Sequence, residues 1–287
     1  MTTFLSILVD GTAYGMILFM ISVGLSVTMG LMRVINLAHG GFALIGGALA
    51  HGLVAAGIGY WPAMALAVAG TMLVALPMEA LLYRRIYRMG ELQQVLATIG
   101  IAFLIIASVN LGLGSTILPI PTPASLRGTL DLGFRTLPYH RIAVILAGLA
   151  VTLLLFLLIE RTRFGIRLRA AVDHRATASV LGINTGQIFA LTFMLGAGLA
   201  ALGGILGAEL LPIDAYYPLR YMVLFLVVVA VGGLGSITGS FLAALGLGIL
   251  DTATRYLVPD WGTIVFFGAM MLILTLRPQG LMGRGRA

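Results

Sequence analysis

Long apolar stretches follow one another along this 287-residue chain, separated by short polar connections. A membrane-spanning α-helix needs roughly 20 predominantly apolar residues, and the chain offers such segments many times over. Hydrophobic residues make up 60% of the sequence and charged residues only 9%, too few charges to cover a water-soluble domain of this size. We therefore expect residues 1–287 to form a single transmembrane domain in contact with lipid.

The length of the stretches favours helices over strands. A strand of a membrane barrel spans with about 10 residues and alternates apolar with polar side chains, whereas these stretches are longer and apolar on all sides. Glycine is abundant, at 38 residues, and small residues allow helices to pack closely within lipid. The expected fold is all-α, a polytopic transmembrane helical bundle of about 8–9 spans. Within it, residues 232–239 form a Gly-rich interrupted or re-entrant segment.

The composition also limits the chemistry of the chain. Cysteine is absent, and the four histidines lack metal-ligand spacing, so we expect no metal site. All 17 basic residues are arginine, and a phosphate-binding loop requires lysine, so ATP would bind another polypeptide. No nucleophile and base form a recognisable motif. We expect no catalytic residues, no cofactor bound by this chain and no nucleic-acid partner.

Arginine clusters predict the orientation in the membrane. They lie in residues 84–88, 161–175 and 277–286, between or after apolar stretches, where positive charge marks the cytoplasmic side. Counting crossings back from these clusters gives about nine passes, with the amino terminus outside and the carboxyl terminus cytoplasmic. The proline-rich residues 114–140 are then an external loop. The first stretch, residues 5–32, is too long for a signal peptide, and we expect it to be retained.

Three polar segments are candidates for function. Asn36, His39, Gly40 and Gly41 form either a capped turn at the cytoplasmic surface or part of a substrate path. Gly233, Gly235 and Ser236 either expose backbone groups to a substrate or allow close helix packing. Asp251 is an intramembrane carboxylate, or it forms an i,i+4 ion pair with Arg255 near the outer surface.

Four ordered motifs resemble one known family over nearly the whole chain. They are Asn36-Leu37-Ala38-His39-Gly40, Leu181-Gly182-Ile183-Asn184, Gly232-Gly233-Leu234-Gly235-Ser236 and Leu276-Arg277-Pro278-Gln279-Gly280-Leu281. The chain is similar to the branched-chain amino acid ABC transporter permease family. Its length and basic tail resemble those of the shorter permease type of the high-affinity importer.

The resemblance implies an assembly in the bacterial plasma (inner) membrane. Its other members are a second homologous permease, giving a heterodimer, two cytoplasmic ATPase subunits that bind ATP, and an external substrate-binding protein. The permease pair would form the translocation path by alternating access. The substrate would be a branched-chain or other small amino acid. Urea or short amides are the alternative substrates, and a stand-alone channel or secondary transporter is the alternative class.

The resemblance also implies a cytoplasmic coupling loop at residues 161–184. A short helix around residues 176–181 would contact an ATPase, with Arg175, Ala178, Leu181 and Gly182 as coupling residues. ABC permeases often carry Glu-Ala-Ala, then glycine four residues later. Here the acidic residue is missing, although the glycine remains.

Overall fold

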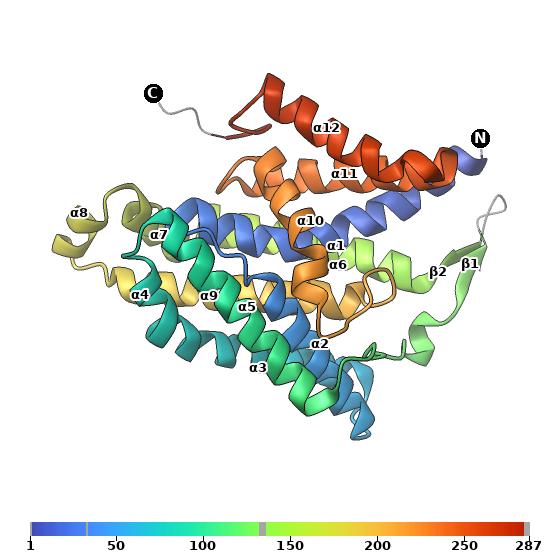
Figure 1. The fold of residues 1–287 in the computed structure, drawn as a ribbon, viewed down its shortest axis with the longest axis horizontal. Coiled ribbons are helices and arrows are strands. Elements are labelled where there is room, and N and C mark those ends of the chain that lie inside the picture. Colours follow the sequence, from blue (N-terminus) through green and yellow to red (C-terminus); the bar gives the residue numbers. More distant parts are fainter. Residues whose placement is uncertain (1, 33, 132–135, 284–287) are drawn as a thin grey trace.

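The computed structural model describes residues 2–32, 34–131 and 136–283, and in this part of the chain nearly all regular structure is helical (Figure 1). Arg284 and Arg286 of the expected cytoplasmic tail lie outside the described residues. The elements are α1 (Thr2–Met32), α2 (Gly40–Ala55), α3 (Tyr60–Met78), the π-helix η1 (Glu79–Tyr83), α4 (Arg84–Ile86), α5 (Glu91–Leu113), the 3₁₀-helix η2 (Ala124–Leu126), β1 (Thr129–Asp131), β2 (Thr136–Pro138), α6 (Tyr139–Arg161), α7 (Arg163–Asp173), α8 (Arg175–Val180), α9 (Thr185–Gly207), α10 (Tyr217–Gly232), α11 (Ile237–Leu257), the 3₁₀-helix η3 (Pro259–Trp261) and α12 (Gly262–Leu276).

The apolar helices agree with the predicted polytopic bundle. Within the described residues, seven helical segments are long and apolar enough to cross a membrane: α1, α3 continued through α4, α5, α6, α9, α11, and η3 with α12. Two further apolar helices, α2 and α10, are shorter. The predicted count of about 8–9 spans thus corresponds to seven full-length segments and two short helices that lie within the bundle.

The molecule has two distinct ends along its long axis (Figure 1). The arginine-rich end carries α4, α7, α8 and the residues after α12, and the hairpin end carries the amino terminus with β1 and β2. The two strands pair antiparallel, with Leu130 opposite Leu137. The sequence predicted an external loop over residues 114–140 and did not reveal this short hairpin within it.

The core lies around α1, α9 and α11. Helix α1 packs against α9, α10 and α11, while α9 also packs against α2 and α3. In its most apolar window, α9 has 72% of its residues buried and α12 only 11%. Helices such as α12 therefore present most of their apolar side chains outward, as expected of segments in contact with lipid or with another membrane subunit.

Glycines allow the central helices to approach closely. A Cβ atom built on Gly24 of α1 would lie 2.5 Å from the carbonyl oxygen of Gly196 in α9. A Cβ built on Gly248 of α11 would lie 2.6 Å from Cα of Gly15 in α1. These backbones are in direct contact, which is how small residues bring helices together in a membrane.

The segment after α3 departs from α-helical geometry. Pro77 lies inside α3 and has no backbone N–H to donate to the preceding turn. The π-helix η1 begins two residues later, and such wide turns accommodate a disturbance in the helical hydrogen-bond ladder. This turn directs Glu79 and the start of α4 toward the first turn of α9, where the site described below is formed.

Candidate functional site

Helix α7 forms an amphipathic segment at the arginine-rich end. The Thr162 side chain accepts a hydrogen bond from the backbone N–H of Gly165 at 3.4 Å and so caps the helix. Leu168 and Ala171 are buried in one cluster with Ile188 and Phe189 of α9. Its arginines are on the other face, so α7 lies against the end of the bundle and holds the following segment in place.

The short helix predicted around residues 176–181 is present as α8, and its end is well defined. The N–H of Gly182 donates to the Ser179 carbonyl at 3.1 Å, and the N–H of Ile183 donates to the Ala178 carbonyl at 3.0 Å. This pair of bonds is the Schellman motif, which requires a left-handed residue after the helix. Gly182 has φ +82°, a conformation that glycine adopts without steric cost.

Helix α8 presents two large apolar side chains to its surroundings. Val180 is 88% exposed and Leu181 is 76% exposed, while Ala178 is buried. Among the predicted coupling residues, Leu181 is thus available to a partner, whereas Ala178 supports the packing of the loop and Gly182 its turn. Val180, which was not among the predicted coupling residues, is exposed next to Leu181.

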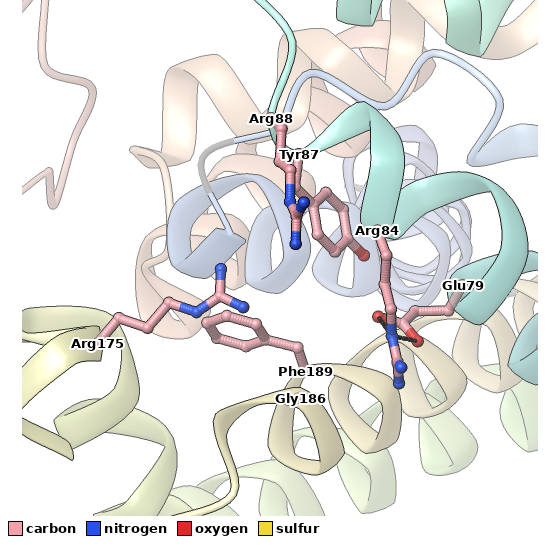
Figure 2. A pocket seen from close by; sticks show the side chains of 7 residues that line it. All are labelled: Glu79, Arg84, Tyr87, Arg88, Arg175, Gly186 and Phe189. Atoms are coloured by element: carbon pink, nitrogen blue, oxygen red, sulfur yellow. Dashed lines mark hydrogen bonds and ion pairs between the residues drawn. The ribbon is translucent and has the colours of Figure 1, made fainter. Parts of the chain in front are cut away.

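Arg175, the first residue of α8, faces a pocket beside the loop (Figure 2). The pocket has a volume of about 250 Å³ and is lined by Glu79, Arg84, Tyr87, Arg88, Arg175, Gly186 and Phe189. The guanidinium of Arg175 lies 5.2 Å from the centre of the Phe189 ring, a cation–π distance. The pocket therefore lies between the start of α8, the segment from the end of α3 through Arg88, and the first turn of α9.

The predicted path residues Asn36 and His39 are buried in the bundle, each 2% exposed. Neither side chain is therefore exposed at a surface of the chain, although the Ala38 N–H donates to Asn36 Oδ1 in a local turn. The chain after α1 turns back into the bundle, so that His39 Nε2 lies 3.1 Å from the Ile21 carbonyl oxygen of α1. Sequence position at the end of an apolar stretch did not reveal this return.

Asn36 belongs to a buried polar cluster. Its Oδ1 accepts hydrogen bonds from the Ala38 N–H at 3.1 Å and from the Tyr83 hydroxyl at 2.9 Å. Its Nδ2 has no hydrogen-bond partner among the described residues. Tyr83 was not among the predicted site residues, because an aromatic residue at the end of an apolar stretch carries no signal of its own in the sequence.

Gly40 and Gly41 lie in the first turn of α2, close to other elements. A Cβ on Gly40 would lie 3.3 Å from Cα of Pro218 in α10, and one on Gly41 would lie 2.6 Å from a side-chain atom of Ile105 in α5. Both glycines thus serve close packing. Their role in a substrate path stays a prediction.

Gly233, Gly235 and Ser236 form the turn between α10 and α11. Gly233 has φ +96° and Gly235 has φ +79°, while the Ser236 hydroxyl accepts a hydrogen bond from the Gly239 N–H at 3.0 Å. The turn packs against other backbone: the N–H of Leu281 donates to the Val231 carbonyl at 2.7 Å. Gly235 lies against Gly30 of α1, and Gly233 lies against the residues after α12. Neither glycine is part of the contact between Asn36 and Tyr83.

Asp251 and Arg255 lie near the hairpin end of α11. Arg255 Nε is 2.8 Å from Asp251 Oδ2, across one helical turn. On α1, Asp10 forms an ion pair with Arg141 of α6 and accepts a hydrogen bond from the Tyr256 hydroxyl at 2.7 Å. These contacts connect α1, α6 and α11, so the charged residues at this end join three helices together.

The fold and the site together define a class of protein. A helical bundle with seven segments long enough to span a membrane carries, at one end, a short capped helix with exposed apolar side chains. Such a polytopic helical bundle is typical of a membrane-embedded transport subunit. Residues 7–275 match the family described as "Branched-chain amino acid transport system / permease component", and the chain belongs to this family. The resemblance predicted from the four motifs is confirmed.

Curated relatives match over nearly the full chain. One is "High-affinity branched-chain amino acid transport system permease protein LivH" of Escherichia coli strain K12, 27% identical over 98% of this chain and 96% of the relative. Another is "High-affinity branched-chain amino acid transport system permease protein BraD" of Pseudomonas aeruginosa, 28% identical with the same coverage. "Probable branched-chain amino acid transport permease protein LivH" of Methanocaldococcus jannaschii is 26% identical over 96% of this chain and 92% of the relative. No solved structure gives a significant match.

Proposed function

We propose that this chain is a membrane permease subunit of an ATP-binding-cassette importer that carries branched-chain amino acids, with α8 as its contact with an ATPase. The family match over residues 7–275 carries the permease function. The ATPase contact rests on the exposed apolar side chains of Val180 and Leu181, at the end of a short helix closed by a Schellman turn. A rigid helix with an apolar tip can insert into a groove on a partner without first having to become ordered. A movement of the partner is then passed on to the permease.

The arginine-rich end is the cytoplasmic end in this proposal. Arg84, Arg85 and Arg88 lie there with the arginines of α7, as the positive-inside rule requires. The chain would be located in the bacterial inner membrane, with its carboxyl terminus in the cytoplasm. ATP would bind to two ATPase subunits at this end, and a substrate-binding protein would dock at the hairpin end.

The translocation path would lie between this chain and a second homologous permease. The close packing of the central helices supports this arrangement, because α1 and α9 are in backbone contact at Gly24 and Gly196. The outward-facing apolar helices offer surface for a heterodimer with the second permease. Alternating access would then arise from movement of the two permeases relative to each other.

The coupling proposal is tested with Leu181→Asp in the reconstituted transporter. A carboxylate at the tip of α8 would have to be desolvated in an apolar groove, so ATPase subunits should be retained less well and ATP-driven uptake should fall at least about tenfold, which corresponds to about 1.4 kcal/mol. Ile117→Asp is the control, because Ile117 is also exposed and apolar but lies in the loop before β1. Unchanged ATPase retention and uptake in Leu181→Asp would contradict the contact.

The substrate proposal needs a separate measurement. Uptake of leucine, isoleucine and valine is compared with uptake of urea and acetamide, using vesicles that contain the assembled transporter and its substrate-binding protein. Branched-chain amino acids should compete with one another and should not be displaced by urea. Preferential uptake of urea or an amide would assign the chain to the alternative substrate, and uptake without ATPase subunits would assign it to a channel or secondary transporter.

A further inference from the structure

The pocket beside the coupling loop has the chemistry of an anion site (Figure 2). Its 250 Å³ lie between the end of α3, the segment through Arg88, and the starts of α8 and α9. Figure 2 shows Arg175 reaching in from one side above the Phe189 ring, with Arg88 and Tyr87 entering from another element. The pocket is thus built from segments about 90 residues apart in the sequence.

Positive charge exceeds negative charge in this pocket. Its lining includes three arginines and a single carboxylate, that of Glu79. Arg84 Nε lies 3.1 Å from Glu79 Oε2, so this pair is neutralised. Neither Arg88 nor Arg175 forms an ion pair with another described residue, and both residues are exposed. Two guanidinium groups therefore remain to bind an anion.

The other lining side chains suit a phosphate. Burial raises the pKa of the Tyr87 phenol well above its ordinary value, so the group stays protonated and neutral at physiological pH. Guanidinium groups bind phosphate oxygens through paired N–H donors, and the Phe189 ring, 5.2 Å from the Arg175 guanidinium, supports this side chain. This combination provides charge and directed hydrogen bonds in one cavity.

The surroundings of the pocket favour a lipid as the source of the phosphate. Leu81 and Leu82 are exposed on the turn between Glu79 and Arg84, which gives acyl chains an apolar surface next to the charged lining. Anionic lipids are enriched on the cytoplasmic leaflet, and basic pockets between transmembrane helices on that side bind their headgroups. We propose that this pocket binds the phosphate of an anionic phospholipid headgroup and thereby connects the segment after α3 to the start of the coupling helix α8.

The test is lipid binding to the detergent-solubilised transporter by native mass spectrometry, with phosphatidylglycerol and phosphatidylethanolamine of the same acyl chains. Arg88→Gln should weaken phosphatidylglycerol binding about fivefold, the factor that corresponds to roughly 1 kcal/mol per arginine near an anionic surface. Arg85→Gln is the matched control, because Arg85 is an exposed arginine on the same segment that does not line the pocket. Arg88→Lys keeps the charge but not the paired donors, so it should weaken binding less than Arg88→Gln does, and phosphatidylethanolamine should bind weakly to every variant.

Several outcomes would overturn the proposal. Equal loss in Arg88→Gln and Arg85→Gln would mean that only diffuse surface charge attracts lipid. Arg88-dependent binding of inorganic phosphate without any binding of phosphatidylglycerol would make a free anion the ligand. Unchanged lipid binding, with weaker retention of ATPase subunits in Arg88→Gln alone, would assign the pocket to a protein interface.

Discussion

Gly182 occupies the single residue at which the chain leaves α8 and turns toward α9. Its φ of +82° lies in the left-handed region, where a side chain with a Cβ atom clashes with its own backbone. A Cβ at this position would meet no other atom within 4 Å. The requirement for glycine is therefore conformational rather than one of space, and this explains why the family motif retains the glycine although the acidic residue is missing.

Replacing Gly182 with alanine should loosen the end of α8. Left-handed backbone costs an L-residue roughly 1–2 kcal/mol, so the amide hydrogens of residues 178–183 should exchange about 5–30 times faster. Hydrogen exchange with mass spectrometry measures this locally. Gly186→Ala in the first turn of α9 is the control, since its Cβ would meet only the Asn184 side chain at an ordinary 3.5 Å. If these amide hydrogens exchange in Gly182→Ala as slowly as in the parent protein, the Schellman assignment is contradicted.

The hydrogen bond from Tyr83 to Asn36 allows the buried polar cluster to be tested by substitution. Tyr83→Phe removes the hydroxyl that donates to Asn36 Oδ1, while the Ala38 N–H still satisfies that oxygen. The expected cost is about 0.5–1.5 kcal/mol, the net value of one hydrogen bond, seen as a lower thermal unfolding temperature of the purified protein. Tyr216→Phe, at a half-exposed tyrosine, should leave the temperature unchanged. A Tyr83→Phe variant as stable as the parent would show that the bond contributes nothing.

At the scale of elements, the close packing of the central helices depends on glycines, which have no side chain. Lipid offers no hydrophobic force that drives helices together, so contact between α1 and α9 depends on how closely their backbones approach. Gly24 and Gly196 provide that approach, and Gly15 and Gly248 do the same between α1 and α11. The short helices α2 and α10 pack against these central helices and against each other.

Gly24→Ala should therefore destabilise the bundle by about 1–3 kcal/mol, the usual cost of an extra methyl group in a packed interior. The new Cβ would lie 2.5 Å from the Gly196 carbonyl oxygen, which neither backbone can avoid without moving. Thermal unfolding in detergent measures the loss. Gly268→Ala in α12 has open space around its Cβ and should be neutral or slightly stabilising, because alanine is the better helix former. Similar behaviour of the two variants would contradict the α1–α9 contact.

At the scale of the whole molecule, charge separates the two ends and burial separates the centre from the periphery. Arginines of α4 and α7 gather at one end, and the Pro-rich segment with its hairpin occupies the other (Figure 1). Outward-facing helices such as α6 and α12 surround the buried α1 and α9.

Orientation is tested by cysteine labelling, which the absence of native cysteine makes simple. In intact cells, a membrane-impermeant maleimide should label Ser125→Cys near the hairpin, and it should label Ala176→Cys on α8 only after permeabilisation. Both positions are exposed, so differences report sidedness rather than burial. Labelling of Ala176→Cys alone in intact cells would reverse the proposed orientation.

The sequence by itself determined the helical membrane class, the positions of the apolar helices and the family, because apolar length and short motifs are local properties of the chain. It also predicted the short helix α8, whose terminating Gly182 lies next to it. Only the tertiary structure decided that Asn36 and His39 turn back into the bundle and that Ala178 is buried beside the exposed Leu181. It alone brought Arg88 and Arg175 into one pocket, since contacts between distant segments depend on how the helices pack and not on the pattern within any one of them.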